Sequence, residues 1–141
     1  MPLTMAQRAA CYVTAAALGG LAVTLAFWVL GNLGVPQLLG ISGPPPALEP
    51  PAIYRTMVWG GLWGFLFLLP VNFGPLWRKA MVLTIAPVLV ALLWFIPRRG
   101  GALLGLDRGY LFPLWVYAVN LAWGFTTAYL GNALIGPEEE G

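Results

Sequence analysis

The sequence contains no histidine and a single cysteine, and charged residues make up only 9% of its 141 positions. Haem with histidine ligation, the usual zinc sites and histidine general bases all require residues that are missing. A lone cysteine cannot form an intrachain disulfide, and Cys11 lies in an apolar run, where we expect a small buried hydrophobe. The scarcity of charge excludes an ordinary water-exposed surface, because soluble proteins carry about 25% charged residues.

The chain also lacks the motifs of several function classes. Neither a P-loop nor a dinucleotide-binding glycine pattern is present, so nucleotide binding has no support. The net charge of +2 is small and scattered, which argues against nucleic acid as a partner. No Asp, Glu or Lys lies well inside the apolar segments, whereas proton-coupled transporters use such groups as relays. We expect no enzyme activity, no cofactor and no metal; an enzyme acting through Asp107 and Glu49 is the less favoured alternative.

Hydrophobic residues dominate what remains, at 60% of the chain against roughly 45–50% in soluble domains. A helix that crosses a bilayer needs about 20 predominantly apolar residues. The sequence therefore predicts an all-α integral membrane protein, in which residues 1–141 form a single four-transmembrane-helix bundle. The predicted spans are residues 9–33, 53–73, 80–96 and 110–134, followed by an acidic tail at residues 135–141.

The segments around these spans carry their own signals. A secretory signal peptide is the alternative for the first span, but its apolar core is only about 7–15 residues long. Prolines at 44–46 and 50–51 predict a stiff, non-helical loop over residues 34–51. The run Pro97-Arg98-Arg99-Gly100-Gly101 is expected to stop the third helix. Residues 102–108 are too short to cross and predict an interfacial link.

Glycine and tryptophan are concentrated in the second span. Gly60 and Gly64 lie four residues apart, which predicts a flat strip where another helix backbone can approach closely. Trp63-Gly64-Phe65 recurs 60 residues later as Trp123-Gly124-Phe125. This match predicts two tandem helical hairpins in parallel orientation, unless it is a chance result of the biased composition. In either case we expect Gly60, Trp63, Gly64, Trp123 and Gly124 to pack between helices.

Four arginines are candidates for contact with lipid headgroups or anions. Arg55 lies about a turn inside the second span, where its long side chain can snorkel to the headgroups. The sharper hypothesis is an anion or headgroup contact at the mouth of the bundle. We assign three further arginines to the same membrane face, namely Arg98, Arg99 and Arg108.

Polar side chains inside the fourth span form a second group of candidates. Asn120 lies near the middle of that span, with Thr126 and Thr127 further along. Polar groups at membrane depth usually turn inward and form hydrogen bonds between helices. We therefore expect an intramembrane polar contact, with a structural role favoured over a functional one.

Two functions remain open after these exclusions. The first is a non-enzymatic subunit or assembly factor that packs against other membrane subunits. The alternative is a small transporter or channel for a neutral or anionic solute or lipid, which would need self-association to enclose a path. Binding of lipid or pigment in tryptophan-rich grooves is a third hypothesis. We expect integral localisation in a bacterial plasma membrane, and the distribution of Arg and Lys favours cytoplasmic termini.

Overall fold

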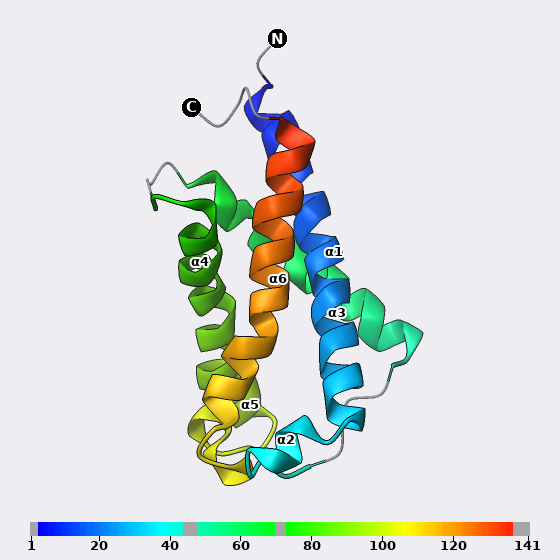
Figure 1. Cartoon of the computed structure of the whole chain (residues 1–141), viewed down its shortest axis with the longest axis vertical. Helices are drawn as coiled ribbons and strands as arrows, with labels where there is room; N and C mark the ends of the chain where they lie inside the picture. The colour runs from blue at the N-terminus through cyan, green and yellow to red at the C-terminus, as the bar shows by residue number, and fades with distance from the viewer. Residues whose placement is uncertain (1–2, 44–47, 70–72, 137–141) are drawn as a thin grey trace.

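The computed structural model describes residues 3–43, 48–69 and 73–136, and these ranges contain helices but no strand (Figure 1). The prediction of an all-helical protein is therefore confirmed. The proline tract at 44–46 and the acidic tail beyond residue 136 lie outside the described residues. In chain order the elements are α1 (Met5–Asn32), α2 (Val35–Leu38), α3 (Pro50–Trp63), the 3₁₀ segment η1 (Gly64–Leu68), α4 (Leu76–Val90), the π-helical segment η2 (Ala91–Phe95), α5 (Ile96–Arg98), the 3₁₀ segment η3 (Leu103–Arg108) and α6 (Phe112–Ile135).

Two helical segments of the described chain are long and apolar enough to cross a membrane. They are α1, with 28 residues, and the continuous run Leu76–Arg98, with 23. The other two predicted spans do not meet both conditions. α3 has only 14 residues before it tightens into η1. α6 has 24 residues, but its apolar side chains alternate with Asn, Thr, Tyr and Trp, which lower its mean hydropathy.

The third helix is longer than predicted at both ends. It begins at Leu76 instead of residue 80, and it continues through η2 into α5. It ends at Arg98, inside the run of residues 97–101 that the sequence predicts as its stop. Gly100 follows, and its φ of +94° is typical of a glycine after a helix C-terminus.

Two other boundaries also differ from the prediction. α1 begins at Met5 because Thr4 and Gln7 form a capping box, which satisfies free N–H groups of the first turn. Residues 34–51 are not a uniform loop, since they contain the single turn α2. Pro50 and Pro51 start α3, because proline is well suited to the first position of a helix.

The four longer helices form a bundle in which α1 and α6 lie side by side (Figure 1). α3 packs on α1, whereas α4 packs on α6. α3 runs obliquely across the bundle and starts part-way along the length of α1 (Figure 1). The start of α1 and the end of α6 share one end of the molecule. α2, α5 and η3 gather at the opposite end (Figure 1).

Glycines bring the helix backbones close together at both sides of α1. A Cβ on Gly20 would collide with the carbonyl oxygen of Thr56 in α3. A Cβ on Gly19 would lie 2.9 Å from the carbonyl oxygen of Trp123 in α6. Small residues therefore set the spacing between the helices. Such residues are common where van der Waals packing, and not the hydrophobic effect, holds helices together.

Candidate functional site

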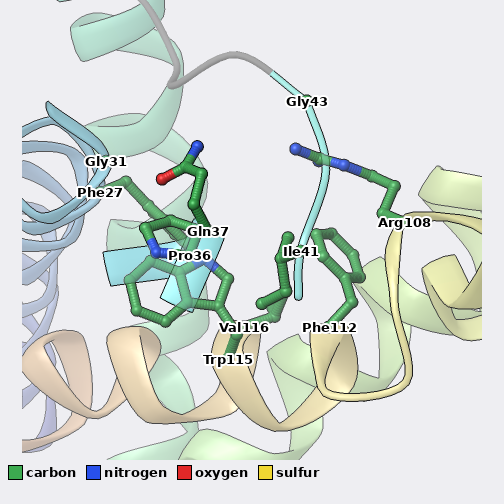
Figure 2. Close-up of a pocket in the computed structure, with 10 residues that line it drawn as sticks. All are labelled: Phe27, Gly31, Pro36, Gln37, Ile41, Gly43, Arg108, Phe112, Trp115 and Val116. Carbon is green, nitrogen blue, oxygen red and sulfur yellow. The ribbon is translucent and has the colours of Figure 1, made fainter. Parts of the chain in front are cut away.

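A roomy pocket lies at the end of the bundle where α1 ends and α6 begins. We call it the Arg108 pocket, and its volume is about 560 Å³. This size is within the range of about 300–1,000 Å³ that holds small organic ligands. Figure 2 shows the residues that line it: Phe27, Gly31, Pro36, Gln37, Ile41, Gly43, Arg108, Phe112, Trp115 and Val116.

Two tight reversals of the chain build this pocket. After α1, Gly34 takes a φ of +84° and the single turn α2 folds residues 35–43 across the end of the bundle. On the other side, Leu104 and Gly105 have left-handed backbone conformations inside η3. This second reversal places Arg108 beside Ser42, where the Ser42 N–H donates to the Arg108 carbonyl oxygen at 2.8 Å.

The Arg108 side chain is held from two sides. Its Nε donates to the Ser42 carbonyl oxygen at 2.9 Å, and its guanidinium lies 4.7 Å from the centre of the Phe112 ring. The terminal Nη groups have no acceptor among the described residues. The neighbouring carboxylate, Asp107, accepts instead from the Ala102 N–H at 3.1 Å. Arg108 therefore presents a fixed positive charge with hydrogen-bond donors to spare.

Opposite this cation the pocket offers one amide and a largely apolar wall. Gln37 is exposed and reaches into the same space from α2 (Figure 2). The floor consists of Ile41, Phe112 and Trp115, which are buried. Phe27 from α1 packs edge-on against Trp115, with ring centroids 6.1 Å apart. Such a pocket is suited to bind an anionic group that carries an apolar portion.

The described lining of the pocket contains no group for covalent or acid–base chemistry. It includes no Cys, Ser, Lys, Asp or Glu. Elsewhere in the described chain, no group of three or more His, Cys, Asp or Glu side chains could hold a metal ion.

The structure brings together three of the four predicted arginines. Arg98, the last residue of α5, and its C-cap Arg99 lie at the same end as the Arg108 pocket (Figure 1). Both are exposed, and their guanidinium groups stack on Trp94 at 4.9 Å and Phe95 at 6.0 Å. Arg55 belongs to α3, which starts part-way along the bundle, so it does not join them.

The predicted polar residues of the fourth span bond within their own helix. Asn120 Nδ2 donates to the Val116 carbonyl at 2.8 Å, and Thr127 Oγ1 donates to the Trp123 carbonyl at 2.7 Å. Both bonds join residues four apart, so neither bridges two helices. Thr127 is fully buried, whereas Thr126 is partly exposed and forms no hydrogen bond within the described residues.

The glycine and tryptophan candidates lie at helix contacts. Gly60 and Gly64 face α1, and Gly124 faces Thr84 and Ala80 of α4. Trp123 Nε1 donates to the Gly60 carbonyl at 3.1 Å and so links α6 to α3. Trp63 Nε1 is buried without a partner among the described residues. Both tryptophans line a second, smaller cavity of about 110 Å³ between the helices.

Sequence reasoning missed Lys79, which precedes the predicted third span at residues 80–96. This lysine lies in the first turn of α4, where Nζ donates to the Phe67 carbonyl at 3.0 Å. The ammonium also lies 5.4 Å from the centre of the Tyr12 ring. Gln37 and Ser42, which build the Arg108 pocket, were missed as well. No local signal marks them, because the pocket depends on a contact between residues 66 positions apart.

The chain matches no protein-family model, no curated protein and no solved structure, so its function has to be inferred from the geometry of its own residues.

Proposed function

We propose that this chain is an integral membrane protein with four crossings, formed by α1, by α3 together with η1, by Leu76–Arg98 and by α6. The length and composition of the first and third segments support this placement. α6 adds 24 residues without a charged side chain. α3 and η1 together cover residues 50–68, with Arg55 as their one charge.

Within that bundle the chain acts as a non-enzymatic subunit that packs against a partner membrane protein. The observation that carries this proposal is the outer α3 face, which we define as Tyr54, Val58, Leu62 and Phe65. These side chains are between 52% and 66% exposed and recur at helical spacing. Phe65 lies in η1, which continues α3. In a bilayer such an exposed apolar face contacts either lipid or another helix, and the crosslinking experiment below distinguishes the two.

A second point supports a packing role over a catalytic one. The glycines and buried threonines of the interior serve close helix contacts and intrahelical bonds, as at Gly64, Gly124 and Thr127. Among the described residues that line the two cavities, none is positioned to act as a general base or a nucleophile. The interior is therefore arranged for packing.

Cysteine accessibility tests the membrane placement. In a background with Cys11→Ser, single cysteines at Ala6 and Leu38 report on opposite ends of α1 and its continuation, and both positions are exposed. With cytoplasmic termini, a membrane-impermeant reagent added to intact cells labels position 38 and leaves position 6 unlabelled. Labelling of both positions from outside, or of neither after cell lysis, would contradict the placement.

Site-specific photocrosslinking tests the packing role. A photoreactive residue at Val58 on the outer α3 face is expected to give a discrete adduct with another membrane protein in native membranes. Leu89 on α4 is the matched control, because it is also apolar and 45% exposed. Equal or no adducts at the two positions would refute the proposal. An adduct of twice the 15.2 kDa chain would identify self-association instead.

The Arg108 pocket favours a second candidate, an oligomeric transporter or channel for an anionic solute or lipid. The pocket and the smaller cavity share none of their described lining residues, so the chain alone does not offer one continuous path through them. A path would need contributions from further copies. Reconstitution in liposomes tests this candidate, and the absence of flux for anions, metabolites and lipids would exclude it.

A further inference from the structure

We propose that the Arg108 pocket binds the headgroup of an anionic phospholipid drawn from the surrounding leaflet. The inference rests on the proposed membrane placement and is separate from the contact through the outer α3 face. The guanidinium group of Arg108 is held in place, but its positive charge is not neutralised. The Ser42 carbonyl and the Phe112 ring use one donor and one face of the group.

The free donors of Arg108 fit a phosphate diester. The Nη groups have no acceptor within the described residues, and Figure 2 shows the guanidinium extending toward Gly43, across the pocket from the Gln37 amide. Guanidinium groups bind phosphate oxygens with charge-assisted hydrogen bonds that are stronger than neutral ones. The Gln37 amide can donate to a second oxygen of the same headgroup.

The apolar wall distinguishes a lipid from a free anion. A site for inorganic phosphate would be lined by further donors, whereas Ile41, Phe112 and Trp115 line most of this pocket with carbon. The glycerol and first methylene groups of a phospholipid fit such a wall. A volume of about 560 Å³ is more than a phosphate alone requires.

The surroundings of the pocket also favour a ligand from the bilayer. The elements that form it carry exposed apolar side chains, as Leu33, Leu38 and Tyr110 show. Tyrosine is enriched at the level of lipid headgroups. Arg98 and Arg99 add positive charge at the same end of the bundle, which attracts anionic over zwitterionic lipids.

Native mass spectrometry of the full chain in mild detergent tests the proposal. The protein is incubated with phosphatidylglycerol, with phosphatidylcholine of the same acyl chains, or with inorganic phosphate. We expect retention of phosphatidylglycerol with about tenfold higher apparent affinity than phosphatidylcholine, because the choline cation is repelled by Arg108. Equal retention of the two lipids would overturn the proposal. Binding of inorganic phosphate without retention of lipid would also overturn it, in favour of a soluble anion.

Three variants test whether the preference for phosphatidylglycerol comes from the Arg108 pocket. Arg108→Gln is expected to lower the affinity for phosphatidylglycerol about tenfold, through loss of charge-assisted hydrogen bonds. Arg98→Gln is the matched control, because it removes the same charge from an exposed side chain at the same end. Arg108→Gln also removes the hydrogen bond to Ser42, which can disturb the local structure. Gln37→Glu then tests the pocket without changing Arg108. Its exposed position makes it harmless to folding, while its carboxylate competes for Arg108.

The outcomes separate this inference from the proposed membrane placement. Loss of binding in Arg108→Gln and Gln37→Glu, with retention in Arg98→Gln, supports the pocket. Equal losses in all three variants, or unchanged binding in Gln37→Glu, would refute it and leave general surface attraction. Carbonate extraction of the wild-type membranes is run in parallel. Release into the supernatant would refute the placement, whereas a membrane-bound chain that fails to retain lipid refutes this inference alone.

Discussion

The same tripeptide occurs at two places in this molecule and adopts two different structures. Trp63-Gly64-Phe65 ends an α-helix and enters the 3₁₀ segment η1, whereas Trp123-Gly124-Phe125 lies inside the regular helix α6. The Trp123 indole donates to the Gly60 carbonyl, but the buried Trp63 indole has no partner among the described residues. Local sequence therefore does not decide the structure of either segment.

The neighbours of each segment explain the difference. α6 packs between α1 and α4, so contacts on two sides hold it in a regular helix. α3 packs mainly on α1, and its outer face remains exposed. A helix supported on one side can tighten into a 3₁₀ turn at little cost. The duplication of two hairpins stays a prediction, and the two matching tripeptides differ in shape.

The largest effect is expected for Gly124→Ala. A methyl group there would collide with Thr84 Oγ1 and would lie 2.9 Å from the Ala80 carbonyl. Thr84 is fully buried and donates to that same carbonyl, so neither group can move aside easily. We expect a loss of about 3 kcal/mol in the free energy of unfolding, at the upper end for overpacking, measured by denaturant titration in detergent.

Gly64→Ala is the comparison for that experiment. Its methyl group would lie 2.7 Å from the Tyr12 carbonyl and from Ala16 Cβ. The cost should be smaller, about 1–2 kcal/mol, because α3 packs mainly on α1 and its outer face is exposed. A cost at Gly64 equal to or above that at Gly124 would show that α3 is held as firmly as α6.

The next effect in size is expected for Trp123→Phe. The change removes the indole N–H that donates to the Gly60 carbonyl. The smaller ring also leaves a void, because Trp123 is only 3% exposed. Loss of this hydrogen bond and a small void together cost about 2 kcal/mol. The apparent melting temperature in detergent should fall, and unchanged melting would mean that this link between α6 and α3 contributes nothing.

Lys79→Met is expected to have a smaller effect. Methionine fills similar space but cannot donate to the Phe67 carbonyl at the end of η1. We expect a loss of about 1 kcal/mol, less than for a buried charged hydrogen bond because the site is partly open. Arg78→Met on the same turn is the control, since Arg78 is exposed beside Trp77. Equal effects would indicate a loss of surface charge and not of this bond.

Composition and hydropathy predicted the helical class, but the helix boundaries depend on local details that are easily misjudged. Pro50 and Pro51 suggested a loop, although prolines at the start of a helix cost nothing. The run of residues 97–101 indicated the end of the third helix, which lies inside that run at Arg98. The start of α1 lies in polar sequence, where the capping box of Thr4 and Gln7 extends the helix beyond its apolar part.

The candidate site was less accessible to sequence reasoning than the fold. Arg108 stood out as a charge in an apolar chain, and its shared end with Arg98 was expected from the order of the spans. Its partners did not stand out. Ser42 meets Arg108 after the chain reverses at Leu104 and Gly105, and the φ of +59° at Leu104 is rare for a leucine. No periodic pattern encodes such a contact, so only the folded structure reveals the pocket.

The smallest effect, and the most informative one, is expected for Trp63→Phe. The indole N–H of Trp63 is buried and unpaired within the described residues, so its removal costs no hydrogen bond. Removing an unsatisfied donor offsets the loss of apolar area, and we expect a change near zero, within about 0.5 kcal/mol. The ring of Trp59, with its centroid 5.8 Å away, can still pack edge-on against phenylalanine. Side by side with Trp123→Phe, the same chemical change would then cost about 2 kcal/mol in one copy of the tripeptide and almost nothing in the other. A clear destabilisation by Trp63→Phe would instead indicate that the indole N–H has an acceptor in the membrane, such as a bound water or a lipid carbonyl in the small cavity that Trp63 lines.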